Sequence, residues 1–389
     1  MRTLASLLLF CAMTHAAELD PIAVGKLVAR AEDARSDALV VMKDGKLVGE
    51  WHFGRPDGLI ETMSMTKSIV NLAIGRLIDA GKIKSIDEPV YTFFPEWKQG
   101  KKKLVTLRHL LNHTSGMQAE RTTGGEIYPS PDFVKLALAA ELSDEPGTKF
   151  FYNNKAVALL AAIVQLASGK RLDLFVRDEL FTPLGITQYE WKLDGAGNPH
   201  ALAGLRLRAI DLARIGVMLA DDGVWAGKRL VSHAWIAESM KPGQALVPTC
   251  GLLWWLIPAW KKFTIDDGVV KAWRDAKLEE SFIARVLPIK DKVFERDAFF
   301  AELGKIFGDP KIETWHEHTW KRGLPDGKLI SGPIVAYEAQ GWLGQYLIVV
   351  PKERLVVVRM VRSTGADDDE KKIDSFSKLP DLALSLLKP

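Results

Sequence analysis

Ser64 and Lys67 are the residues of this sequence whose types and spacing most directly indicate chemistry. They belong to the S-x-x-K segment Ser64-Met65-Thr66-Lys67, which opens an apolar stretch (residues 65–80) that predicts a buried helix. Side chains three positions apart share one face of a helix. A serine hydroxyl becomes nucleophilic when a nearby base takes its proton, and burial or a neighbouring positive charge can make lysine such a base. The segment therefore predicts nucleophilic catalysis at Ser64.

An S-x-x-K pattern is short, and it recurs at Ser375 and Ser385 in what reads as a surface region of the C-terminal helix. A second segment, Tyr152-Asn153-Asn154, gives the pattern at Ser64 its weight. A tyrosine near a lysine can transfer protons once positive charge lowers its pKa, and Asn154 can hold the lysine or a substrate amide. The alternative interpretation of this segment is a turn after Pro146-Gly147.

Several segments in a fixed order together resemble the class C β-lactamase-related family, which also includes D-Ala-D-Ala carboxypeptidases, serine esterases and nylon-oligomer hydrolases. The segments are Met63-Ser64-Met65-Thr66-Lys67-Ser68, Thr106-Leu107-Arg108-His109-Leu110-Leu111-Asn112-His113-Thr114-Ser115-Gly116-Met117 and Pro146-Gly147-Thr148-Lys149-Phe150-Phe151-Tyr152-Asn153-Asn154. The resemblance implies that Ser64 is acylated and that Lys67 and Tyr152 handle its proton, with either as the base. It also implies an oxyanion hole made by the backbone N–H groups of Ser64 and Trp342, and no metal or organic cofactor.

The third motif of that family departs from its pattern in this sequence. The strand that carries Lys-Thr-Gly or His-x-Gly in β-lactamases and peptidases of this kind corresponds here to Ala339-Gln340-Gly341, which has no positive charge. Loss of the charge-assisted contact weakens binding of a substrate carboxylate. Gln340 and Gly341, with Asn154, are the expected substrate-binding residues.

The sequence therefore predicts an exported serine hydrolase that acts through an acyl-enzyme on a small ester or uncharged amide. The alternatives are a penicillin-binding β-lactamase or D-Ala-D-Ala carboxypeptidase and, on the same fold, a non-catalytic binding protein. The isolated His316-Glu317-His318 lacks the spacing of a zinc motif, so no metal site is expected.

The elements that must position these residues indicate an α/β fold. Alternating residues on both sides of Asp44-Gly45 predict one hairpin (residues 38–53), and residues 345–361 predict a second at the other end of the chain. The periodicity between them is mostly helical. We expect an antiparallel sheet built from both chain ends and flanked by helices, with an inserted, mainly helical lobe. The expected domains are residues 17–80 with 245–389 for the α/β domain and 81–244 for the lobe.

Residues 258–331 read as an extra helical insertion, rich in aromatic and charged side chains. It enters just before the third motif, and in the resembling fold that connection borders the mouth of the active site. We therefore expect a helical lid or wall with Trp273, Phe294, Phe299 and Phe300 among its apolar contacts. The alternative is a surface elaboration remote from the site.

The N-terminus has the layout of a secretory signal peptide over residues 1–16: Met1-Arg2, an apolar run and Thr14-His15-Ala16 before the cleavage point. It predicts a periplasmic or secreted protein whose only remaining cysteine is Cys250. A net charge of +3 over 389 residues gives no basis for binding nucleic acid, and no segment is long enough for stable membrane insertion. The expected partner is a small-molecule ester or amide, and the sequence does not indicate an oligomeric state.

Overall fold

The structure is a computed structural model of the chain, and it describes residues 19–120, 123–322, 324–363 and 374–387. The predicted signal peptide (residues 1–16) lies outside the described residues.

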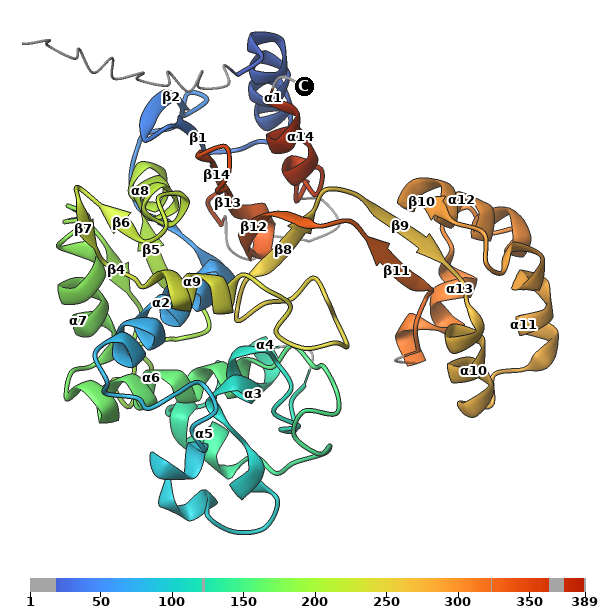
Figure 1. The fold of residues 1–389 in the computed structure, drawn as a ribbon, viewed down its shortest axis with the longest axis horizontal. Coiled ribbons are helices and arrows are strands. Elements are labelled where there is room, and N and C mark those ends of the chain that lie inside the picture. Colours follow the sequence, from blue (N-terminus) through green and yellow to red (C-terminus); the bar gives the residue numbers. More distant parts are fainter. Residues whose placement is uncertain (1–18, 121–122, 323, 364–373, 388–389) are drawn as a thin grey trace, which may run out of the picture. The chain divides into compact units, whose positions relative to one another are not determined.

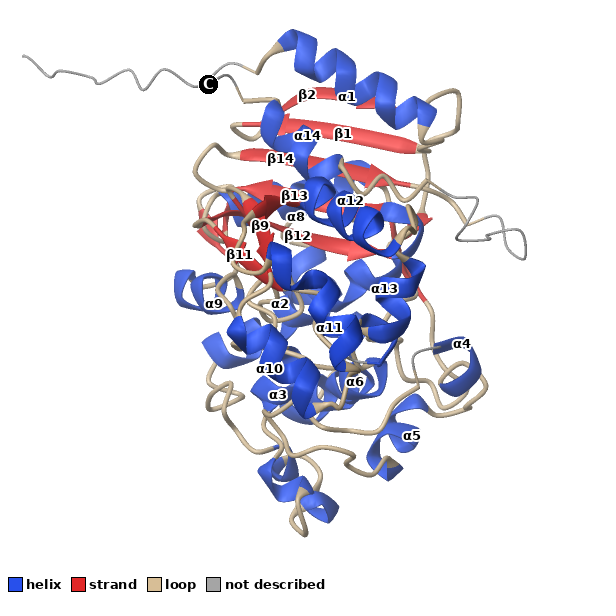
Figure 2. Cartoon of the chain, turned by 90° about the vertical axis from the view of Figure 1, so that its right-hand side faces the viewer, coloured by secondary structure: helices blue, strands red, loops and turns tan. Residues whose placement is uncertain are grey.

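The largest sheet in the described part of the chain has the strand order β2-β1-β14-β13-β12-β8, and Figure 2 shows the first five of these strands side by side. Its strands are β1 (Ala38–Lys43), β2 (Lys46–Trp51), β8 (Trp255–Pro258), β12 (Ile334–Gly341), β13 (Gln345–Val350) and β14 (Leu355–Met360). β1 pairs antiparallel with β14, so the two predicted hairpins join in the middle of one sheet. This arrangement confirms the expected fold class.

Local sequence explains the central strands. β13 and β14 are buried along their whole length, which fits their runs of valine, leucine and isoleucine. Asp44 and Gly45 connect β1 to β2 with φ values of 53° and 74°. Two residues with positive φ form the turn whose twist matches that of a β-hairpin.

Helices cover both faces of this sheet. Figure 1 shows α1 (Pro21–Asp33) and α14 (Leu379–Ser385) on one side and α8 (Ala209–Ala220) on the other. The Asp20 side chain caps α1 by accepting the N–H of Ile22 at 2.9 Å, as the Asp-Pro start of this helix predicts. These helices bury the apolar faces that a sheet would otherwise expose to water.

The rest of this part of the molecule is mainly helical. Its helices are α2 (Thr66–Asp79), α3 (Leu107–Leu111), α4 (Thr123–Glu126), α5 (Phe133–Ala139), α6 (Asn154–Ser168), α7 (Leu172–Val176) and α9 (His233–Ser239). Short strands accompany them: β3 (Ile60–Glu61), β4 (Glu190–Trp191), β5 (Leu205–Leu207), β6 (Val224–Trp225) and β7 (Lys228–Arg229). α2 is buried along most of its length, as its apolar sequence predicts.

Contacts divide the chain into two compact units, one of Met1–Leu256 with Ala336–Pro389 and one of Ile257–Val335. The predicted boundary between an α/β domain and a helical lobe falls inside the first unit and stays a prediction. The second unit contains α10 (Asp267–Asp275), α11 (Glu280–Val286), α12 (Arg296–Phe307) and α13 (Glu313–His318). It also contains a small antiparallel sheet in the order β10-β9-β11, which the helical pattern did not predict: β9 (Lys261–Thr264), β10 (Phe294–Glu295) and β11 (Lys328–Ser331).

The second unit has a hydrophobic core of its own. Trp273, Phe299 and Trp315 are fully buried in it, and the indole N–H of Trp273 donates to the carbonyl of Pro325 at 2.8 Å. Both side chains pack inside the unit, and whether the unit forms a lid or wall at the active site stays a prediction. Phe294 and Phe300 pack against this core and keep part of their surface.

No helix among the described residues combines the length and the apolar character that crossing a membrane requires.

Candidate active site

One small cavity, of about 10 Å³, brings together four of the residues singled out from the sequence: Ser64, Lys67, Tyr152 and Gln340. The remaining lining residues are Ser68, His113, Cys250, Leu253, Trp254 and Trp255. All of them belong to the first unit. Residues far apart in the chain therefore converge at the start of α2.

Ser64 and Lys67 are in direct contact. Ser64 lies in a short 3-10 turn, η1 (Met63–Met65), and Lys67 lies in the first turn of α2. The Lys67 ammonium, with its side chain almost completely buried, donates to Ser64 Oγ at 2.9 Å and to the carbonyl of Leu202 at 2.7 Å. This second bond fixes the amine at the serine, so a proton can pass directly between the two side chains.

The turn that presents Ser64 is held in a strained backbone conformation. Met63, directly before Ser64, has a φ of 49°, a region that side chains other than glycine seldom adopt. Thr66 Oγ1 donates to the Met63 carbonyl at 2.7 Å, and Thr62 Oγ1 donates to the Leu205 carbonyl at 3.0 Å. Such strain costs about 1–3 kcal/mol per residue and persists where surrounding contacts over-determine it, as they often do at functional sites.

Buried hydrogen bonds connect α2 to the segment that forms the far wall of the cavity. Ser68 Oγ donates to the Leu253 carbonyl at 2.6 Å. Asn71 Oδ1 accepts the indole N–H of Trp254 at 3.3 Å. A polar group that is buried without a partner is costly, so these bonds define the position of residues 253–254 relative to Ser64.

Tyr152 packs against two other rings. Its ring centroid lies 4.5 Å from that of His113 and 6.4 Å from that of Trp255, which is stacked on it at 12°. The Lys67 ammonium lies over the Tyr152 ring, 5.0 Å from the centroid. Tyr152 therefore belongs to the Ser64–Lys67 cavity. Among the bonds made by the described residues, none involves the Tyr152 hydroxyl, so proton transfer by this residue stays a prediction.

His113 is a lining residue to which the sequence analysis assigned no role. Its ring is fully buried, and Nδ1 accepts the backbone N–H of Asn153 at 3.2 Å. Burial and, second, the positive charge of Lys67 lower the pKa of His113 to about 3. His113 is therefore neutral at neutral pH and packs against the Tyr152 ring.

Asn154 is not among the residues that line this cavity. Its amide nitrogen donates to Thr123 Oγ1 at 2.5 Å, while Oδ1 is buried without a hydrogen-bond partner among the described residues. The structure therefore places Asn154 at the first turn of α6, bonded toward α4. Substrate binding by Asn154 stays a prediction.

The end of β12 meets the serine turn at Gly341. A Cβ atom at this position would lie 2.5 Å from the Thr62 carbonyl oxygen and 3.0 Å from Met63 Cβ, so only glycine allows this approach. Trp342 follows at the start of the 3-10 turn η8 (Trp342–Gly344). The predicted oxyanion hole needs the N–H groups of Ser64 and Trp342 to converge, and it stays a prediction.

Gln340 also borders a second, larger hollow of about 470 Å³, lined by Gly341, Trp342, Leu343, Gly344, Tyr346, Ser375 and Ser377. The Gln340 amide nitrogen donates to Glu338 Oε1 at 2.5 Å, and the Glu338 side chain is buried. Glu338 was not predicted as a site residue, although side chains two positions apart on a strand share a face.

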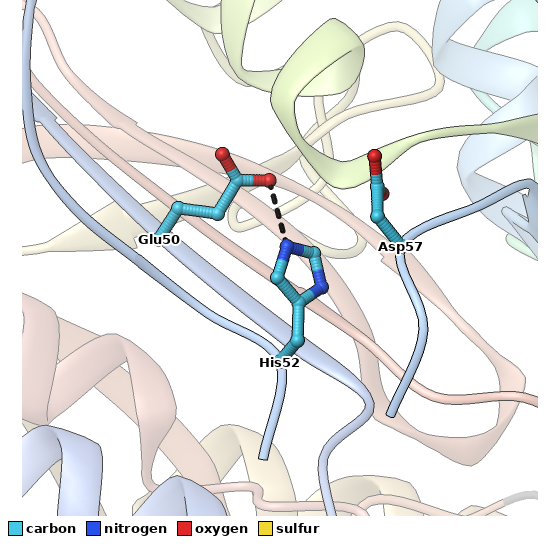
Figure 3. Close-up of side chains that lie close together, drawn as sticks. All are labelled: Glu50, His52 and Asp57. Carbon is cyan, nitrogen blue, oxygen red and sulfur yellow. Dashed lines mark hydrogen bonds and ion pairs between the residues drawn. The ribbon is translucent and has the colours of Figure 1, made fainter. Parts of the chain in front are cut away.

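Figure 3 shows the candidate metal ligands Glu50, His52 and Asp57, which offer atoms within 4.8 Å of one another. The His52 ring is hydrogen-bonded to Glu50 at 3.1 Å. Arg208 lies close enough for the charges of Asp57 and Glu50 to contribute to its raised pKa, which its hydrogen bond to Asp211 raises most. A cation beside both carboxylates opposes binding of a metal ion, and we assign this trio no role.

A serine and a lysine in contact at the start of a buried helix, beside an antiparallel sheet from both chain ends, define an S-x-x-K site on a penicillin-recognising fold. The family model described as Beta-lactamase matches residues 24–256, and the chain belongs to this family.

Two curated relatives of the chain are named for different reactions. The esterase EstB of Burkholderia gladioli is 34% identical over 155 residues, which cover 34% of this chain and 39% of the esterase. The 6-aminohexanoate-dimer hydrolase of Paenarthrobacter ureafaciens is 27% identical over 233 residues, which cover 55% of this chain and 59% of the hydrolase. The chain thus spans between two-fifths and three-fifths of the length of these relatives.

Solved structures share the fold over nearly the whole chain. The D-alanine carboxypeptidase AmpC of Burkholderia cenocepacia superposes with a TM-score of 0.56 and 17% identity, covering 94% of this chain and 98% of the carboxypeptidase. At this identity the likeness shows the fold alone.

Proposed function

We propose that this protein is an exported serine hydrolase that cleaves a small ester or uncharged amide through an acyl-enzyme on Ser64. The observation that carries the proposal is the 2.9 Å contact between the buried Lys67 amine and Ser64 Oγ, inside a cavity that Tyr152 also lines. The relatives named as an esterase and as a dimer hydrolase support the same reaction class.

In the acylation step, Lys67, Tyr152 or both take the Ser64 proton as Oγ attacks the substrate carbonyl. The negative charge of the tetrahedral intermediate rests on the N–H groups of Ser64 and Trp342; each such donor is commonly worth about 10²–10³ in rate. The leaving alcohol or amine departs with a proton delivered through Tyr152. A water molecule, deprotonated by the same residues, then hydrolyses the acyl-enzyme and restores the Ser64 hydroxyl.

The third motif directs the choice of substrate. Ala339, Gln340 and Gly341 provide no cation for a substrate carboxylate, whereas β-lactams and peptidoglycan stems carry one. Esters and uncharged amides therefore fit this site better than either anionic class.

A substrate panel tests the proposal. The mature protein is assayed on short acyl esters, an uncharged amide and the β-lactam nitrocefin, with Ser64→Ala as the control. We expect ester turnover that is lost in Ser64→Ala, together with covalent labelling of Ser64 by a fluorophosphonate. Rapid nitrocefin turnover with little ester hydrolysis would support the β-lactamase alternative, and absence of any reaction would favour a binding protein.

Export rests on the predicted signal peptide and has its own test. The protein is expressed with its N-terminus intact and recovered from the periplasm and the medium, and its mass is measured. Loss of residues 1–16 is expected, and recovery of the full-length chain from the cytoplasm alone would contradict export.

A further inference from the structure

The Gln340 amide has a defined orientation. Gln340 and Glu338 lie two positions apart on β12, so both side chains stand on the same face of the strand. A carboxylate accepts hydrogen bonds and does not donate them, so the amide group that faces Glu338 must be the NH₂ group. The bond from Gln340 Nε2 to Glu338 Oε1, at 2.5 Å, has this arrangement.

This bond leaves the amide oxygen for the substrate. No described residue donates a hydrogen bond to Gln340 Oε1, and Gln340 lines both the small cavity at Ser64 and the larger hollow beside Trp342. A group in the substrate that meets this oxygen must be a donor, because two acceptors repel one another.

The charge of Glu338 acts on a neighbouring side chain of the sheet. Tyr346 stands opposite Gln340 on β13, and burial raises its pKa to about 12, with a further contribution from the charge of Glu338. Arg359 stands opposite Tyr346 on β14, but its guanidinium donates to the carbonyls of Leu343 and Gly344 at 3.1 and 2.8 Å. The recognition end of the site therefore combines an acceptor oxygen with a buried acidic group, where related enzymes have a cation.

We propose that Glu338 determines specificity: by holding the Gln340 amide nitrogen it turns the amide oxygen to the substrate, so that the site selects substrates with an uncharged or cationic hydrogen-bond donor at this position and rejects carboxylates. The inference rests on the proposed function, because it concerns the substrate of the same site. The substrate class is a short acyl ester whose alcohol portion carries an amide or an ammonium group.

Four aryl acetates that differ in one ring substituent test this inference. They carry a methyl, a carboxamide, an aminomethyl or a carboxylate group, and each rate is divided by that of hydroxide-catalysed hydrolysis to correct for the leaving group. For the wild-type protein we expect kcat/KM for the carboxamide and aminomethyl esters to exceed that for the carboxylate ester about 30-fold, since like charges brought together inside a site are costly.

The Glu338→Gln variant tests the orientation of the Gln340 amide and leaves the other residues of the site unchanged. With two amides in contact, the Gln340 amide can turn either way, so the carboxamide-to-carboxylate ratio should fall about tenfold. Glu353→Gln makes the same change in the turn between β13 and β14, outside the residues that line the two hollows, and should keep the wild-type ratio. If Glu338→Gln does not fold, Gln340→Met removes the amide and should abolish the preference for carboxamide over methyl.

Two outcomes would overturn the inference: a wild-type preference for the carboxylate ester, or an unchanged ratio in a folded Glu338→Gln or Gln340→Met protein. Binding of the same four compounds to Ser64→Ala, measured by calorimetry, gives the ranking without turnover. Absence of hydrolysis would refute the proposed function at Ser64, whereas a binding order that favours the carboxylate would refute the role of Glu338.

Discussion

The two ends of the cavity at Ser64 differ in what holds them and in how closely they follow the expected pattern. At the η1–α2 end, Lys67 is fixed between Ser64 Oγ and a backbone carbonyl, and both residues match the S-x-x-K pattern. At the β12 end, the backbone approach at Gly341 is kept, but the cation is absent and Glu338 orients Gln340. The serine end thus keeps the expected side-chain pair, whereas the β12 end keeps the expected backbone approach but not the expected side chain.

The largest expected effect is at the η1–α2 end. Lys67→Met keeps a chain of similar length but removes the amine, and kcat/KM for an aryl acetate should fall about 10³-fold, within the range for loss of a general base. Lys98→Met makes the same change at an exposed position and serves as the control, with the kcat/KM of the wild type expected. If the kcat/KM of folded Lys67→Met stayed within threefold of the wild-type value, the Ser64–Lys67 contact would have no catalytic role.

The next effect is at the junction of the two ends. In Gly341→Ala, the added Cβ must move away from the Thr62 carbonyl oxygen, which would otherwise lie 2.5 Å from it, and β12 must separate from the serine turn. A displacement of about 1 Å can cost 10²-fold in rate, so kcat should fall about 10²-fold. Gly25→Ala in α1, where nothing lies within 4 Å of the added atom, is the control. An unchanged kcat in Gly341→Ala would mean that catalysis does not need the close approach of β12 to the serine turn.

A smaller effect is expected at the β12 end. Gln340→Lys supplies a cation beside Glu338 and should shift the carboxylate-to-carboxamide ratio of kcat/KM about tenfold toward the carboxylate ester. Gln99→Lys adds the same charge at an exposed position and should leave the ratio unchanged. A shift of similar size in both variants would mean that overall charge, and not the cavity, sets the preference.

Sequence patterns predicted the parts of the molecule that depend on local spacing. The alternation around Asp44-Gly45 gave the first hairpin, and the spacing of Ser64 and Lys67 gave their contact. The carbonyl that fixes Lys67 belongs to Leu202, and Trp254 is bonded to α2 through Asn71. No periodicity reports such contacts, because they join residues more than a hundred positions apart.

The Glu338–Gln340 pair could have been read from the strand alternation, but only with the cavity known does the orientation of the amide matter. The second unit illustrates a further limit. Its aromatic residues predicted apolar contacts, but the pattern did not show that Trp273 and Phe299 pack in a core of the unit's own. The composition of a segment shows that apolar surface will be buried, but not against which partner.

The smallest expected effect concerns the charge state of His113, which lines the cavity with Lys67. The pKa of His113 is about 3 in the folded protein, against 6.5 as its ordinary value. Between these values the unfolded chain binds more protons than the folded one, so lowering the pH favours unfolding. From pH 6 to pH 5 His113 alone should lower the free energy of unfolding by about 1 kcal/mol.

His109 and His200, whose pKa values are also lowered chiefly by burial, act in the same direction, so a variant must isolate His113. His113→Asn suits the measurement because asparagine tolerates the φ of 60° at this position. Urea unfolding at both pH values should show a smaller loss of stability in His113→Asn than in the wild type, whereas His233→Asn, at an exposed position, should behave as the wild type. Equal losses in all three proteins would mean that His113 is not held neutral beside Lys67.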